Sequence, residues 1–136
     1  MTAITHSVAE TENVAARLAP TLPPGSCIAL HGDLGAGKTQ FVRGLIKGLG
    51  GHGRAVSSPT FVLLNVYATP TLTVYHLDAY RVFGPEDFEA IGFAELLEQG
   101  GLVVVEWPER IAGLIPPAAI HVRITTRTKN TRQIEW

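Results

Sequence analysis

Residues 28 to 45 read Ile-Ala-Leu-His-Gly-Asp-Leu-Gly-Ala-Gly-Lys-Thr-Gln-Phe-Val-Arg-Gly-Leu, and this stretch decides the fold. It contains the pattern G-x-x-x-x-G-K-[ST], which is typical of a phosphate-binding loop, or P-loop. An apolar run of strand type, Cys27 to Leu30, precedes the loop, and apolar side chains at helical spacing follow it from Thr39 to Leu49. The motif requires a strand before it and a helix after it, so this context argues against an ordinary glycine-rich turn.

The residue types of the loop suit a nucleotide. Its glycines can take positive φ and let the backbone close around an anion without clashes of Cβ atoms. The N–H groups of the loop and of the first helical turn then point at phosphate oxygens, and the helix dipole adds to the attraction. Lys38 brings a flexible positive charge to the β- and γ-phosphates, and Thr39 brings a hydroxyl for Mg²⁺.

The composition indicates one globular domain over residues 1–136. Hydrophobic residues make up 46% of the chain, charged residues make up 17%, and the net charge is −1. A protein that holds nucleic acid by neutralising phosphates is normally basic, so we expect any nucleic acid to be reached through a partner. The lone cysteine, Cys27, excludes an intrachain disulfide and fits the cytoplasm, where we expect the chain to work. No run approaches a membrane span, and the first residues lack the features of a signal peptide.

Strands and helices are expected to alternate along the chain. The expected elements are a helix over 7–19, a strand over 26–31, the loop helix over 39–49, a hairpin over 60–67 and 72–77, a helix over 85–99 broken at Gly92, a buried strand over 102–106, a short helix or turn over 111–114, a half-exposed strand over 119–125, a polar turn over 126–130 and a last strand over 133–136.

Two acids at strand ends are candidates for the chemistry beside the phosphates. Glu106 ends the most apolar strand, and Asp78 directly follows the Val74–Leu77 run. P-loop enzymes commonly place such an acid near Mg²⁺. We expect Glu106 to bind the metal directly or through water, and Asp78 to bind the metal or orient the attacking water. The alternative is that each acid caps a turn or pairs with an arginine.

Other positions carry weaker signals. Trp107 follows Glu106 and either stacks on a base or partner, or packs at the sheet edge. The segment Ser58 to Thr60 lies where such proteins often sense the γ-phosphate, although its local chemistry indicates only a turn. His31 and His76 flank the site, and each is expected to be a local hydrogen-bonding residue. The alternative is that they touch phosphates or hold a carboxylate.

Four segments in order resemble one family. They are Gly32-Asp33-Leu34-Gly35-Ala36-Gly37-Lys38-Thr39, Ser58-Pro59-Thr60-Phe61, Tyr75-His76-Leu77-Asp78-Ala79-Tyr80-Arg81 and Val105-Glu106-Trp107-Pro108-Glu109. The chain is similar, over nearly its whole length, to the TsaE (formerly YjeE) family of small ATPases needed for threonylcarbamoyladenosine (t6A) modification of tRNA. The P-loop alone would indicate only a very large superfamily, so the later segments carry the resemblance.

The resemblance implies an α/β fold, a single P-loop NTPase domain with a central mixed sheet flanked by helices. It implies ATP and Mg²⁺ as cofactors, weak hydrolysis by the chain alone, and TsaD and TsaB as protein partners through which tRNA is reached. By position it implies that the nucleotide is held by Asp33, Leu34, Gly35, Ala36, Gly37, Lys38, Thr39 and Trp107. It implies further that Thr39 and Glu106 bind the metal, that Lys38, Asp78 and Glu106 are catalytic, and that the helix start near His6 and Ser7 approaches the adenine.

Two other functions stay open. A small kinase would use the same loop to phosphorylate a metabolite, although the sequence offers no arginine-rich lid and little chain for a substrate pocket. A docking module would use the nucleotide to stabilise a surface, with hydrolysis incidental. An arginine finger is not evident, and Arg43, Arg54 and Arg81 are the candidates for one.

Overall fold

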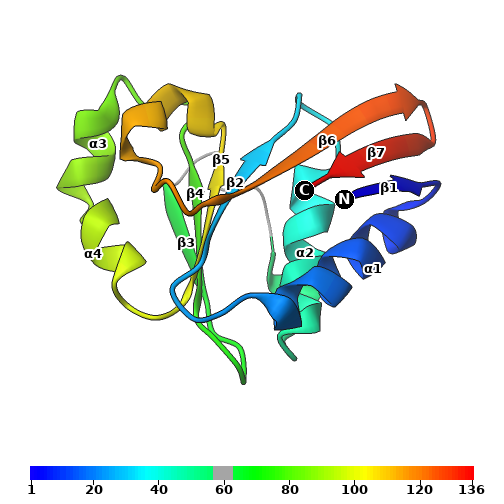
Figure 1. Ribbon diagram of the computed structural model, residues 1–136, viewed down its shortest axis with the longest axis horizontal. Helices are drawn as coiled ribbons and strands as arrows, with labels where there is room; N and C mark the ends of the chain where they lie inside the picture. The colour runs from blue at the N-terminus through cyan, green and yellow to red at the C-terminus, as the bar shows by residue number, and fades with distance from the viewer. Residues whose placement is uncertain (57–62) are drawn as a thin grey trace.

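The computed structural model describes residues 1–56 and 63–136 and contains a mixed β-sheet with helices on both faces (Figure 1). The strands are β1 (Thr2–Thr5), β2 (Cys27–His31), β3 (Leu64–Tyr67), β4 (Val74–Asp78), β5 (Leu102–Glu106), β6 (Ile120–Thr128) and β7 (Thr131–Glu135). The α-helices are α1 (Val8–Leu18), α2 (Lys38–Gly48), α3 (Pro85–Ala90) and α4 (Phe93–Leu97), and the 3₁₀ helices are η1 (Ala19–Thr21), η2 (Gly53–Ala55) and η3 (Pro108–Leu114).

The strand order places several strand ends at one edge of the sheet. Over the described residues this order is β1-β7-β6-β2-β5-β4-β3. The pairs β6–β2, β2–β5 and β5–β4 are parallel, whereas β1–β7, β7–β6 and β3–β4 are antiparallel. The carboxyl ends of β2, β4 and β5 therefore meet at the same edge, where ligands of open α/β sheets bind.

Each face of the sheet carries its own apolar core. Helices α1 and α2 cover one face, and α3 and α4 cover the other (Figure 1). Successive side chains of β5 alternate between the two cores, with Leu102 and Val104 in the first and Val103 and Val105 in the second. This burial on both faces explains the unbroken apolar run in the sequence.

Helices α1 and α2 pack closely because glycines lie at their contact. A Cβ atom built at Gly44 would lie 2.2 Å from the carbonyl oxygen of Glu12, and one at Gly48 would lie 2.4 Å from that of Ala16. Helix α1 begins at the N-cap Ser7, whose hydroxyl accepts a hydrogen bond from the Glu10 N–H at 3.1 Å. Ser7 therefore caps α1, and the close contact fixes α2, which follows the P-loop, against α1.

Most expected elements are confirmed, including the buried strand, the hairpin of β3 and β4, and the helix break at Gly92. Strand β1 was not expected. The expected polar turn over 126–130 is wrong in its first half, because β6 continues to Thr128 in pairing with β7. Among the described residues no helix is both long and apolar enough to cross a membrane. The segment Ser58 to Thr60 and the start of the expected hairpin, 60–62, lie outside the described residues.

Candidate nucleotide-binding site

The P-loop joins β2 to α2 and has the backbone that its glycines predict. Gly35 and Gly37 have φ of +79° and +109°, in the left-handed region that favours glycine. Gly37 is the N-cap of α2, and its carbonyl accepts the Phe41 N–H at 2.9 Å. A Cβ atom at Gly32 would lie 3.0 Å from the Ile124 carbonyl, so glycine also lets the loop start close against β6.

Lys38 lies inside the site with its charge only partly compensated. Its side chain is 6% exposed, and its Nζ has no hydrogen-bond partner within residues 1–56 and 63–136. Nζ lies 3.9 Å from Glu106 Oε1 and 3.8 Å from the centre of the Trp107 ring. Burial lowers the pKa of Lys38, while Glu106 and Asp78 oppose that shift. A buried ammonium whose hydrogen-bond donors lack partners is costly, and the oxygens of an anion would satisfy them.

Glu106 is held in place by a histidine from the neighbouring strand. Its Oε2 lies 2.5 Å from His76 Nε2, and the His76 side chain is fully buried. With Glu106 ionised, Nε2–H donates this hydrogen bond. The other carboxylate oxygen, Oε1, faces Lys38. His76 thus holds a carboxylate, which was the alternative to the favoured expectation of a local hydrogen bond, and its partner is 30 residues away.

Asp78 lies beside Glu106, at the end of β4. The two residues are register partners across β4 and β5, and the Ala79 N–H donates to the Glu106 carbonyl at 3.0 Å. Asp78 Oδ1 accepts the Tyr80 N–H at 2.8 Å. Burial raises the pKa of Asp78, with a smaller contribution from Glu106, whereas the Tyr80 N–H and Lys38 lower it. The carboxyl is thus more basic than an exposed aspartate.

Trp107 places its ring against the Lys38 ammonium. Its φ of +57° is a left-handed backbone conformation that non-glycine residues seldom adopt and that costs energy. Its ring also packs on that of Tyr80, with centroids 4.9 Å apart. The two expected roles of Trp107, stacking on a base or partner and packing at the sheet edge, both stay predictions.

The remaining expected residues lie around these groups. Asp33 and Leu34 are exposed on the P-loop, Ala36 is buried beneath it, and Thr39 is half-buried in the first turn of α2. The structure thus gathers Lys38, Asp78, Glu106 and Trp107 beside the loop.

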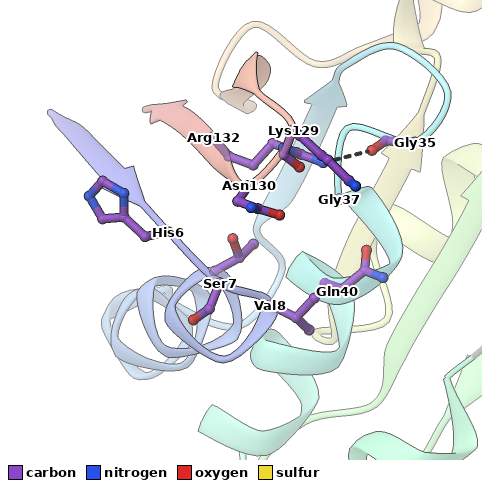
Figure 2. Close-up of a pocket in the computed structure, with 10 residues that line it drawn as sticks. His6, Ser7, Val8, Gly35, Gly37, Gln40, Lys129, Asn130 and Arg132 are labelled. Carbon is purple, nitrogen blue, oxygen red and sulfur yellow. Dashed lines mark hydrogen bonds between the residues drawn. The ribbon is translucent and has the colours of Figure 1, made fainter.

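A cleft opens beside the P-loop between the start of α1 and the β6–β7 hairpin (Figure 2). Its lining includes His6, Ser7, Gly35, Gly37, Lys129 and Asn130. The sequence placed His6 and Ser7 near a base, but nothing in the pattern pointed to Lys129 or Asn130. These two residues come from a hairpin about 90 residues further along the chain and reach the loop only through the sheet order.

A second cleft lies on the other side of Gly32 and is lined by His31, Trp107 and Arg123, among others. There His31 Nε2 and His121 Nδ1 are 3.0 Å apart, and His31 Nδ1 is 3.8 Å from Glu109. Burial, followed by the charge of Arg123, lowers the pKa of His31. His31 forms a hydrogen bond as expected, but the bond is not local, because its partner lies on β6, 90 residues away.

The residues present fit a nucleotide with a divalent cation. The Lys38 ammonium, which has no hydrogen-bond partner among the described residues, and the positive-φ glycines suit phosphate oxygens. In the described part of the chain no group of three or more His, Cys, Asp or Glu side chains gathers as a metal site. Mg²⁺ in a nucleotide site usually takes few protein ligands, and the carboxylate of Glu106 is an oxygen donor of the preferred kind.

Comparisons with known proteins agree on one family. The family model described as threonylcarbamoyl adenosine biosynthesis protein TsaE matches residues 5–134. A protein of Rickettsia typhi named tRNA threonylcarbamoyladenosine biosynthesis protein TsaE is 42% identical over 127 residues, which are 93% of this chain and 88% of that protein. A protein of the same name from Treponema pallidum is 38% identical over 98% of both chains. The crystal structure of YdiB from Bacillus subtilis is similar with a TM-score of 0.81 and 30% identity, over 98% of this chain and 82% of that one.

Proposed function

This chain belongs to the TsaE family of tRNA threonylcarbamoyladenosine biosynthesis proteins, and from this premise we propose that it is a Mg²⁺-dependent ATPase that works with TsaD and TsaB in the cytoplasm. The observation that carries the proposal is the buried Lys38 ammonium, which lacks a hydrogen-bond partner among the described residues and lies between a P-loop and Glu106. Phosphate oxygens would supply that partner.

The P-loop binds the phosphates of the nucleotide. The N–H groups from Asp33 to Thr39 and the Lys38 ammonium hold the phosphates, and the nucleoside lies in the cleft beside His6 and Ser7. The Thr39 hydroxyl and the Glu106 carboxylate would hold Mg²⁺. When bound, Mg²⁺ neutralises charge that develops on the phosphate oxygens.

Hydrolysis requires a group that positions water, and Asp78 is suited to it. Its raised pKa makes it a better proton acceptor than an ordinary aspartate, and the Tyr80 N–H orients its carboxyl group. Glu106 is less suited to this role, because one oxygen is bonded to His76 and the other faces Lys38. We therefore assign metal binding to Glu106 and water positioning to Asp78.

Turnover by the chain alone is expected to be slow. Two of the arginines considered as fingers, Arg43 and Arg54, line a separate cleft with Glu12 and Lys47. Arg43 also donates to the Val56 carbonyl at 3.3 Å. The charge stabilisation that an arginine finger supplies would then come from Arg81 or from a partner, and a finger from the partner would make ATP hydrolysis depend on the complex.

The test is reconstitution of tRNA modification. Purified chain is added to TsaD, TsaB, tRNA and the activated threonylcarbamoyl donor, with and without ATP. Repeated rounds of modification that require both the chain and ATP would support the proposal, and modification indifferent to the chain would overturn it.

Two variants separate the rival functions. Lys38→Ala is expected to lose nucleotide binding, and Glu106→Gln is expected to bind ATP but lose hydrolysis. If Glu106→Gln supports full multi-round modification, the chain is a nucleotide-dependent docking module. A phosphorylated small-molecule product would show a kinase.

A further inference from the structure

Arg132 joins two parts of the fold that are far apart in sequence. It lies at the start of β7, and its guanidinium reaches from the β6–β7 hairpin to the P-loop (Figure 2). Nε donates to the Ala36 carbonyl at 3.0 Å, and Nη2 donates to the Gly35 carbonyl at 3.4 Å. On the other side, Nη1 donates to the carbonyls of Thr128 and Lys129, at 3.0 and 3.3 Å.

These contacts act on the part of the P-loop that does not meet the ligand. A P-loop binds anions with its N–H groups, so carbonyls of the same peptides must point elsewhere and find other donors. Arg132 supplies donors to two consecutive carbonyls of the loop. The Ala36 carbonyl shares its peptide with the Gly37 N–H, so by holding that carbonyl Arg132 keeps the Gly37 N–H available for phosphate, whereas the Ala36 N–H donates to the Asp33 carbonyl within the loop at 3.0 Å.

The guanidinium is the side-chain group that can make all these contacts. Its five N–H donors lie in one plane and point in fixed directions, whereas a lysine ammonium is a point charge on a flexible chain. A lysine at this position would keep the charge but could not hold the hairpin and the loop together.

We propose that Arg132 is a positioning residue that presets the P-loop for phosphate and couples it to the hairpin tip, where Lys129 and Asn130 line the same cleft. The proposal rests on the nucleotide binding proposed above. An ordered loop loses less conformational entropy when it binds a ligand, so Arg132 should increase the affinity for nucleotide. Arg132 touches no reacting atom, and kcat at saturating ATP should change little.

The experiment compares Arg132→Lys with a matched control, Arg127→Lys, at an exposed position of β6. Binding of ATP and of ADP is measured by titration calorimetry, and hydrogen exchange of the loop amides is measured without nucleotide. For Arg132→Lys we expect Kd to rise about tenfold, as the loss of one or two hydrogen bonds of ordinary net strength implies. We expect a similar rise in KM, faster exchange over residues 34–37, and little change in kcat. Arg127→Lys should behave as the wild type.

Three results would overturn the proposal. One is an Arg132→Lys variant with wild-type Kd and wild-type exchange over the loop. Another is an equal loss of affinity in Arg127→Lys, which would show a general effect of arginine. The third is faster hydrogen exchange throughout the sheet rather than in the loop, which would show a structural role only. If the lysine variant folds poorly, the exchange measurement is repeated with Arg132→Gln. If the wild type binds no nucleotide, the proposed function fails, but exchange in the free protein still decides whether Arg132 orders the loop.

Discussion

Replacing His76 by glutamine or by methionine separates its hydrogen bond from its packing. Both replacements have nearly the same shape, and the terminal nitrogen of glutamine lies near the position of His76 Nε2. Only glutamine can donate to Glu106. The difference between the two variants therefore measures the bond that holds Glu106, with most of the packing cost cancelled.

The expected difference follows from burial. His76 is 0% exposed and Glu106 is 5% exposed at the side chain, so water cannot replace the lost donor. A hydrogen bond to a charged group contributes about 1.5–3 kcal/mol. The unfolding entropy of a chain of 136 residues is about 0.29 kcal/mol/K from the average per-residue value. The methionine variant should therefore unfold about 5–10 °C below the glutamine variant.

The assay is thermal unfolding followed by circular dichroism, near neutral pH and without nucleotide. The same pair of variants is then compared in a Glu106→Gln background, where the buried carboxylate charge is absent. There the difference between them should shrink, because the two sites are coupled. The Mg²⁺ concentration for half-maximal ATP hydrolysis should also be higher for the methionine variant, whose Glu106 is no longer held.

Equal unfolding temperatures for the two variants would refute this reasoning. A difference of the same size in the Glu106→Gln background would refute it as well, because the donor would then be serving another group.

Three further predictions concern separate parts of the molecule. Asp78→Asn should raise the free energy of unfolding at pH 7. The pKa of Asp78 in the folded state lies above its unfolded value of 3.8, so the stability of the wild type falls as the pH rises through these two values. The advantage of the variant should therefore vanish below about pH 4, and equal stability of the two proteins at pH 7 would contradict the prediction. Gly44→Ala should cost about 1–3 kcal/mol in urea unfolding, because its Cβ atom would lie 2.2 Å from the Glu12 carbonyl, whereas Gly113→Ala, with nothing within 4 Å, should change stability by less than about 0.5 kcal/mol. Cys27 should resist alkylation at pH 8 until the protein is denatured, because burial raises its pKa to about 12, and rapid labelling of the native protein would show that the thiol is accessible.

The sequence predicts those parts of the fold whose cause is local. The P-loop depends on four positions within eight residues, and the burial of β5 depends on an apolar run that fills both cores. The break at Gly92 follows from its φ of +79°, which glycine adopts easily. For these features the neighbouring residues are sufficient evidence.

Features that depend on pairing between distant residues could not be predicted from the sequence. Strand β1 is short and largely exposed, and it pairs with β7, which lies at the other end of the sequence. The contacts of His31 with His121 and of Arg132 with Ala36 join residues 90 and 96 positions apart. Such contacts require the order of strands in the sheet, and no local pattern encodes that order.

The position of Trp107 gives the molecule an optical readout of its own. Indole emission responds to a charge held against the ring, and the Lys38 ammonium lies 3.8 Å from the ring centre. If that ammonium turns toward phosphate, the emission of Trp107 must change with occupancy of the loop. The chain contains two tryptophans, so Trp136→Phe would leave Trp107 as a single fluorophore that follows ligand binding in real time without a dye.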